Sequence, residues 1–485
     1  MRFDRWSASC RLRGGVVVRG GAVWAASTFV AVTVFAGPPA VTDLARPASA
    51  REARNAVVAE VLARHPDVRA AAAAVEAAVE QPSQAGALPD PVFTVAYQND
   101  GTAPSLGSEE MTQLAFVWSQ AIPFPGKLAT ASEARGRVVE LARARLERVR
   151  RDVREQVEKG WVALALAARS RALLDDESRA VSDVEAIARA RYAAGLVSQP
   201  EVLRAQVELA RLEQARLDAG LAHGLALSEL NRLRDRPGDT PVPESAALEL
   251  DATPPDRAAV LAAAEKESPE LVAATATLDR AGLERTLAQK AVLPDFYLSG
   301  GYMNRGGLEP MWQASVGLSL PLWAVEKQQP ALREAEAQTR GAEAALDSIR
   351  SLVRVRTEQR LDAIAALLAT LAVERDSVLG HEELAVEAAL ATYRAGQSSL
   401  GTVLEPLVTL YRDRASHAAR IADLEVLRAE LAALSLAPVR VSARVMGGSP
   451  SGGGMEPAPA GAEIRADQPS STSPAAAGTS GGMGM

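Results

Sequence analysis

Two patterns of apolar and polar residues alternate along the chain. Long stretches place apolar residues three and four positions apart, as on one face of an α-helix, and short stretches alternate them with small or polar residues, as in a β-strand. The helical pattern covers about 51–85, 127–191, 199–233, 257–290 and 328–392, followed by a last stretch ending near Leu434. Strand alternation falls within 92–120 and 296–320. We predict a mainly α chain with two β-hairpins.

The stretch from Lys127 to Arg191 contains no proline, and its apolar residues recur as in a coiled-coil seam. As one helix of about 65 residues it would be ~98 Å long, and two 35-residue helices laid end to end would match it at ~104 Å. Helices this long are expected to form the wall of a tube, where each packs against a neighbour on both sides.

Glycine and proline mark the ends of these helices. Gly195 and Gly396 each interrupt a helical pattern, in the manner of a helix C-terminus. Ser198-Gln199-Pro200-Glu201 resembles a capping box that opens the next helix. Because proline is poorly tolerated inside a helix, the last helix is expected to start near Thr402 or to kink at Pro406.

The chain repeats itself in order, which indicates an internal duplication. Four motifs recur at offsets of 203, 205, 198 and 201 residues: His65-Pro66-Asp67 with Ser268-Pro269-Glu270, Leu88-Pro89-Asp90 with Leu293-Pro294-Asp295, Ile122-Pro123-Phe124 with Leu320-Pro321-Leu322, and Tyr192-Ala193-Ala194-Gly195 with Tyr393-Arg394-Ala395-Gly396. We assign a first repeat to 51–235, with its hairpin at 92–120 and a coiled-coil pair at 127–233. A proline-rich linker (236–256) separates it from the second repeat (257–437), with its hairpin at 296–320 and coiled-coil pair at 328–434.

Each hairpin presents one apolar face. The residues expected to contact lipid are Phe93, Tyr97, Phe116 and Trp118 in the first hairpin and Phe296, Tyr302 and Trp312 in the second. Strands of about 9–10 residues can cross a bilayer when tilted. Within lipid only a closed barrel leaves no unpaired backbone edge, and four strands are too few to close one. The chain is therefore expected to oligomerise, and three copies would supply twelve strands.

Both ends of the chain differ from the repeats. Residues 1–50 combine arginines, an apolar run from Gly21 to Ala36 and the small-residue site Ala48-Ser49-Ala50, which is typical of a secretory signal peptide. A membrane anchor is the alternative, although the run is short for one. The tail at 438–485 is rich in Gly, Ser, Pro and Ala and is expected to be disordered. Its methionines would suit Cu(I), or they reflect composition alone.

Composition narrows the function. A net charge of −7 offers no basic surface for nucleic acid, and the single cysteine excludes a disulfide scaffold. The four histidines show no metal-ligand spacing, and the chain has no Ser-His-Asp order or Gly-rich phosphate loop. We therefore predict a protein that is not an enzyme and has no cofactor and no metal site.

The whole order of elements resembles the TolC family of outer-membrane efflux proteins. The residues that carry the resemblance are Leu88-Pro89-Asp90-Pro91, the strand exit from Ser119 to Lys127 and the paired Tyr-x-x-Gly turns, within about residues 51–435. The resemblance implies a homotrimer, with a 12-stranded β-barrel in the outer membrane and an α-helical barrel across the periplasm. It also implies docking to a periplasmic adaptor and an inner-membrane pump. The exit Pro123-Phe124-Pro125-Gly126-Lys127 is similar to that of members serving heavy-metal pumps of the resistance-nodulation-division class.

The same resemblance suggests roles for residues at the helix tips. Contacts with the adaptor are expected at Ala194, Gly195, Leu196, Ala395, Gly396 and Gln397. Family members constrict the pore with a tyrosine and acidic residues near the turns, positions that Tyr393, Glu201 and Glu405 match here. Rings of like charge in a trimer would favour cations. Alternatively, Glu201 and Glu405 cap helices, since each is the fourth residue of a Ser/Thr-x-x-Glu sequence.

We therefore predict the exit duct of a tripartite efflux system, with substrates such as copper, silver, zinc or cobalt ions. An outer-membrane channel for drug efflux or type I protein secretion is an alternative. A soluble periplasmic coiled-coil adaptor is another, although the duplication and the two amphipathic hairpins favour the duct.

Overall fold

The computed structural model describes residues 50–106, 109–242, 248 and 250–439. The predicted signal peptide lies outside these residues except for Ala50, and the predicted tail except for its first two residues. Residues 243–247 and 249 of the predicted linker also lie outside them. Both repeats are described almost completely.

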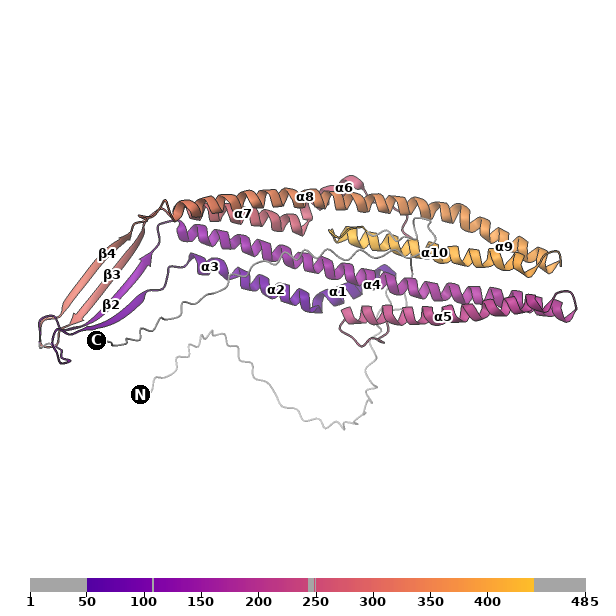
Figure 1. Cartoon of the computed structure of the whole chain (residues 1–485), viewed down its shortest axis with the longest axis horizontal. Coiled ribbons are helices and arrows are strands. Elements are labelled where there is room, and N and C mark those ends of the chain that lie inside the picture. Colours follow the sequence, from indigo (N-terminus) through magenta and orange to yellow (C-terminus); the bar gives the residue numbers. More distant parts are fainter. Residues whose placement is uncertain (1–49, 107–108, 243–247, 249, 440–485) are drawn as a thin grey trace, which may run out of the picture. The chain divides into compact units, whose positions relative to one another are not determined.

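The two predicted hairpins are confirmed, and they join into one antiparallel sheet at one end of the helices (Figure 1). Its strands are β1 (Val92–Gln98), β2 (Gln113–Ile122), β3 (Asp295–Asn304) and β4 (Met311–Ser319), in the order β1-β2-β3-β4. The pairing of β2 with β3 connects the first repeat to the second, and β1 and β4 form the two edges.

The strand register gathers the predicted lipid-contacting aromatics on one face. Phe93 lies opposite Trp118, Phe116 lies opposite Tyr302, and Tyr302 lies opposite Trp312. Since opposite residues in an antiparallel pair share a face, Tyr97 and Phe296 also belong to this face through their partners Leu114 and Ile122. Trp312 is 79% exposed and Phe93 64% exposed. The sheet thus has an uncovered apolar face.

The long helices follow the predicted plan closely. The first repeat has α4 (Lys127–Ala193) and α5 (Gln199–Leu233). The second has α8 (Gln328–Val373), α9 (Leu379–Arg394) and α10 (Leu400–Ala432). A π-helical turn, Glu374–Val378, connects α8 to α9 and was not predicted.

Two helical stretches differ from the prediction. The region 51–85 is not one helix but three, α1 (Ala50–Arg64), α2 (Pro66–Val79) and α3 (Gln81–Gly86), and its counterpart is split into α6 (Arg257–Glu267) and α7 (Pro269–Lys290). Pro66 and Pro269 are each the first residue of a new helix, a place where the missing N–H costs nothing. Helix α10 starts at Leu400, close to the predicted start near Thr402, and continues through Pro406.

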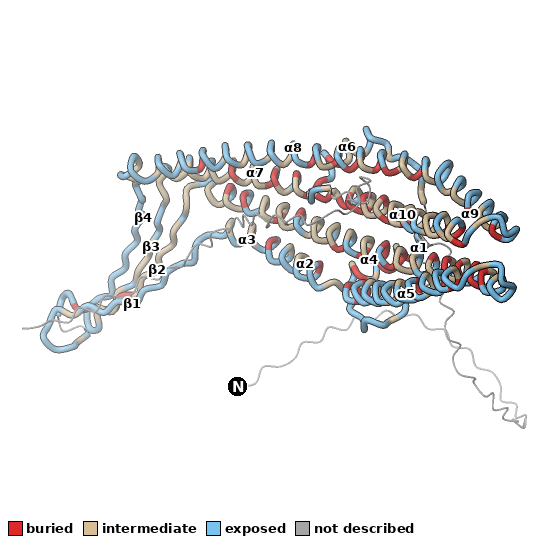
Figure 2. Tube along the Cα trace, turned by 45° about the vertical axis from the view of Figure 1, so that its right-hand side comes forward, coloured by how far each residue is buried: buried red, intermediate tan, exposed pale blue. Residues whose placement is uncertain are grey.

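The helices lie side by side in layers (Figures 1 and 2). Near the sheet, α4 packs between α2 and α3 on one side and α7 on the other, and α7 also packs on α8. Farther from the sheet, α4 contacts α5 and α10, and α10 contacts α9. Helix α4 thus ties the two repeats together along its whole length.

None of the helices in the described part of the chain is long and apolar enough to cross a membrane.

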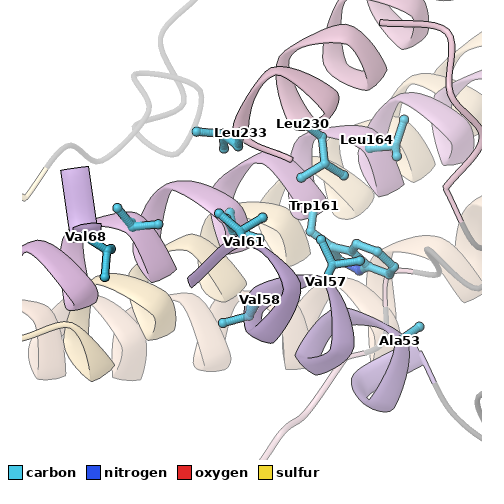
Figure 3. Packing of buried hydrophobic residues seen from close by; sticks show 11 residues of the cluster. Ala53, Val57, Val58, Val61, Val68, Trp161, Leu164, Leu230 and Leu233 are labelled. Atoms are coloured by element: carbon cyan, nitrogen blue, oxygen red, sulfur yellow. The ribbon is translucent and has the colours of Figure 1, made fainter. Parts of the chain in front are cut away.

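A buried cluster around Trp161 holds three segments of the first repeat together (Figure 3). Trp161 of α4 packs with Val57 and Val61 of α1 and with Leu230 near the end of α5. Trp161 is 3% exposed, and Leu230 is fully buried. Because the ring fills the space between three helices, it fixes the positions of both ends of the first repeat.

A buried ionic group holds the helices of the second repeat together. Arg360 of α8 donates from Nε to Glu430 Oε2 of α10 (3.3 Å) and from Nη2 to the carbonyl of Ala437 (2.8 Å). Lys159 of α4 donates to Glu430 Oε1 (2.7 Å). Removing one member of such a group leaves a buried charge without its partner. The end of α10 is therefore fastened to both α4 and α8.

One buried carboxyl group on α4 forms no ion pair with the residues that the structure describes. Glu177 is 8% exposed and faces α5, where Glu208 is its charged neighbour. Burial and, to a smaller extent, the negative charge of Glu208 together raise the pKa of Glu177 from 4.5 to about 7. The folded protein thus favours the neutral carboxyl group.

We predict that Trp161→Ala lowers the free energy of unfolding by about 3–5 kcal/mol, because it empties the centre of the cluster. Thermal unfolding followed by circular dichroism measures this loss. Leu217→Ala on the exposed face of α5, where the side chain is 68% exposed, is the matched control and should change little in the isolated chain. Equal losses in both variants would contradict the assigned core.

We also predict that stability falls as the pH rises from 4.5 through about 7, the interval between the ordinary and folded pKa values of Glu177. In this interval the folded chain binds more protons than the unfolded chain, so raising the pH favours unfolding. Glu177→Gln should remove this component and raise the melting temperature at pH 8.

The control is Glu185→Gln, since Glu185 is also buried on α4 but accepts a 2.6 Å ion-pair contact from Arg189. This variant should not be stabilised at pH 8. A pH profile unchanged by Glu177→Gln would refute the assignment.

Candidate functional site: the helix tips

The two turns farthest from the sheet are built alike. Gly195 and Gly396 have φ of 73° and 79°, a left-handed conformation that glycine adopts without strain. In the first turn the N–H of Leu196 donates to the carbonyl of Arg191 and that of Gly195 to Tyr192, both at 2.9 Å. The second turn has the equivalent pair of bonds at 3.0 Å. Both helices end in a Schellman motif, as the glycines predicted.

The six residues predicted for adaptor contact are all exposed at these turns. They are Ala194, Gly195, Leu196, Ala395, Gly396 and Gln397. Leu196 is 68% exposed. The tips therefore present a small, apolar surface.

Tyr393 occupies the interior of the tip. It is fully buried in a cluster to which all four helices contribute: Val184 and Ala188 from α4, Val202 and Ala205 from α5, and Leu400 and Val403 from α10. The Arg191 guanidinium stacks on its ring at 4.7 Å and donates to its carbonyl at 3.0 Å. Its counterpart Tyr192 is 46% exposed. Tyr393 thus joins the two tip hairpins.

Glu201 lies close to this tyrosine. Burial raises the pKa of Tyr393, the negative charge of Glu201 raises it further, and the positive charge of Arg191 opposes both. The Tyr393 hydroxyl and Glu201 Oε2 are buried, and neither meets hydrogen-bonding geometry with a described partner. A phenol and a carboxylate can form a strong O–H···O⁻ bond.

The capping hypotheses are only partly supported. Ser198 does occupy the N-cap of α5, but its side chain makes no capping hydrogen bond. Ser399, not Thr402, occupies the N-cap of α10, so the capping role proposed for Glu405 is wrong. Glu405 lies on the exposed surface of α10.

Arg191 was not singled out from the sequence, although it organises the tip. The available signal was its place in the last turn of α4, where a cation interacts favourably with the helix dipole. The second repeat has Thr392 at the matching position beside its tyrosine.

No group of three or more His, Cys, Asp or Glu residues that could hold a metal ion occurs among the described residues.

Comparison with known proteins identifies a family and individual proteins that are similar to this chain. The family model of the outer membrane efflux protein matches residues 57–235 and 260–435. A protein similar to this chain is the cobalt-zinc-cadmium resistance protein CzcC of Cupriavidus metallidurans, 28% identical over 299 residues that cover 60% of this chain and 70% of CzcC.

Two solved structures share the fold. The outer-membrane channel OprN superimposes with a TM-score of 0.67 at 17% identity, covering 82% of this chain and 90% of OprN. CusC superimposes with a TM-score of 0.66 at 16% identity, covering 81% and 95%. The match of both repeats to the family model shows that this chain belongs to the outer membrane efflux protein family and serves as an exit duct in the outer membrane.

Proposed function

We propose that three copies of the chain form one duct, with a 12-stranded β-barrel in the membrane and an α-helical barrel in the periplasm. The observation that carries this proposal is the four-stranded sheet with an apolar face and edges at β1 and β4. An open edge is not tolerated in lipid, and four strands cannot enclose a pore.

The outer face of α5 supports the assembly. Five apolar residues lie on it with exposed fractions between 49% and 68%: Leu203, Val207, Leu217, Leu221 and Leu225. At the opposite edge of the helical layer, Val373 and Leu384 are 60% and 64% exposed. Apolar rows of this length are normally covered by a partner. In a ring of copies, α5 of one would cover α8 and α9 of the next.

The cargo we propose is heavy-metal cations, delivered by an inner-membrane pump of the resistance-nodulation-division class through a periplasmic adaptor. The similarity to CzcC, which is named for cobalt, zinc and cadmium resistance, supports this substrate class. The adaptor would dock on the exposed turns at Gly195 and Gly396, whose apolar surface includes Leu196.

The gate we propose is the contact between the tip hairpins. Tyr393 holds the hairpins together through its buried ring, and Glu201 is the group with which its hydroxyl would bond in one of two states. Exposed Glu405 would contribute a ring of three carboxylates that attracts cations to the entrance.

The substrate proposal predicts that the chain restores metal export to cells that keep a metal pump and adaptor but lack their exit duct. Intracellular zinc, cobalt and cadmium, measured by mass spectrometry, should fall when the chain is expressed. The protein should fractionate with the outer membrane as a trimer. The control is a dye expelled by a drug pump in the same cells; dye export without metal export would exclude the metal assignment.

The gate proposal predicts that Tyr393→Ala raises single-channel conductance by at least about two-fold, because it removes the aromatic side chain that holds the two tip hairpins together. Tyr192→Ala is the matched control, since this tyrosine is equivalent in sequence but exposed. Glu201→Gln and Glu405→Gln should reduce the preference for cations. Identical conductance in both tyrosine variants would rule out Tyr393 as the gate.

A further inference from the structure

The two repeats are joined by the β2–β3 strand pairing and by an ion pair beside it, which together we call the joint. Lys127, the first residue of α4, donates from Nζ to Asp295 Oδ1 and to the carbonyl of Leu293, both at 2.8 Å. The N–H of Phe124 donates to the same Asp295 oxygen at 2.8 Å. The first hairpin is thereby fastened to the start of the second, next to the β2–β3 pairing.

The sequences of the two repeats correspond at this joint, with a separate offset for each strand. Asp90 of the first repeat corresponds to Asp295 at an offset of 205, and Ile122 corresponds to Leu320 at an offset of 198. These offsets convert the first hairpin register into the second: the pair Val92–Ser119 becomes Tyr297–Gly317, which the structure contains. The sequence repeat is therefore also a repeat of strand pairing.

A counterpart of one residue of this ion pair lies next to each edge strand of the sheet. Asp90, the counterpart of Asp295, lies just before edge strand β1, and Lys327, the counterpart of Lys127, follows edge strand β4 and caps α8. The offset of 200 from Lys127 to Lys327 also relates four buried positions of α4 to four of α8: Val153, Val157, Trp161 and Leu164 to Val353, Thr357, Leu361 and Ile364.

Both charged side chains lack a partner in the single chain. Asp90 and Lys327 are exposed, and neither side chain has a hydrogen bond or ion pair within the part of the chain that the structure describes. A cation at a helix N-terminus is disfavoured by the helix dipole. Lys127 has the same unfavourable place, and Asp295 compensates it. An equivalent carboxylate would compensate Lys327 in the same way.

The helical layer has matching open sides. Helix α4 packs on α2 and α3 of its own repeat and on α7 of the other, whereas α8 packs on α7 alone among these helices. The free side of α8 corresponds to the side of α4 that α7 of the other repeat covers.

We infer that a second copy of this chain repeats the internal joint at the boundary between copies. This inference rests on the proposed trimer and specifies its contact. Applying the offsets to the β2–β3 register pairs β4 of one copy with β1 of the next as Leu318–Phe93, Val316–Val95 and Ala314–Tyr97. The apolar faces stay aligned in this register, and Lys327 of one copy reaches Asp90 of the next.

Paired cysteines test the register. In a Cys10→Ser background, which removes the only native cysteine, Val316→Cys with Val95→Cys should give disulfide-linked dimers and trimers on a non-reducing gel. Opposite residues have Cα atoms about 4.5–5.5 Å apart, within the range of a disulfide.

The matched control moves one cysteine by two residues. Val316→Cys with Tyr97→Cys lies on the same face but on a diagonal of about 7–8 Å, too far for an unstrained disulfide. It should cross-link at least about ten-fold more slowly, because disulfide geometry is specific. Phe116→Cys with Tyr302→Cys, opposite each other within one chain, should link without changing the mass.

Charge reversal tests the ion pair. Asp90→Lys and Lys327→Asp should each lower the temperature at which the detergent-purified oligomer dissociates, and the double variant should recover at least half of the loss. The inference is overturned if the double variant is no better than the singles, or if the off-register cysteines link as fast as the in-register pair.

Light scattering of the unmodified protein distinguishes failure of the trimer proposal from failure of the inferred contact between copies. A monomer would remove both the trimer proposal and this inference. A trimer with the wrong cross-linking pattern would remove only the inferred contact.

Discussion

The pairing of β2 with β3 is the interaction on which the rest of the structure depends. It joins the two hairpins, which would otherwise be separate, into one sheet. Along the same line, Lys127 binds Asp295, and α4 packs against α7 and then α10. Because this seam uses one flank of each repeat, the other flanks stay open, and exposed backbone edges and apolar rows collect there.

Much of this fold could be predicted from the sequence because strong local signals mark it. Alternation of Phe93, Val95 and Tyr97 defines β1, and the glycines at 195 and 396 define the tips. The breaks at Pro66 and Pro269 were missed because the apolar spacing continues through them, while a proline can begin a new helix. Periodicity reports which face is buried and not where the axis bends.

The tip was predicted only in part, for a different physical reason. The sequence indicated a tyrosine before each glycine, and the family resemblance, not the local pattern, selected Tyr393 for the pore constriction. Tyr393 is fully buried, whereas Tyr192 is 46% exposed. The difference comes from the packing around each side chain, since residues of α4, α5 and α10 enclose Tyr393 at the end of α9. The local sequence pattern cannot show which of the two tyrosines is covered by other helices.

The π-helical turn at Glu374–Val378 explains how a repeat of unequal length stays aligned. Before it, the buried residues of α4 and α8 correspond at an offset of 200, and after it, Tyr192 and Gly195 correspond to Tyr393 and Gly396 at 201. One inserted residue would rotate everything beyond it by about 100° in an unbroken α-helix. A single π turn absorbs that residue locally. The second repeat thus keeps its core and its tip in phase, and carries the trace of an insertion that its helix has tolerated.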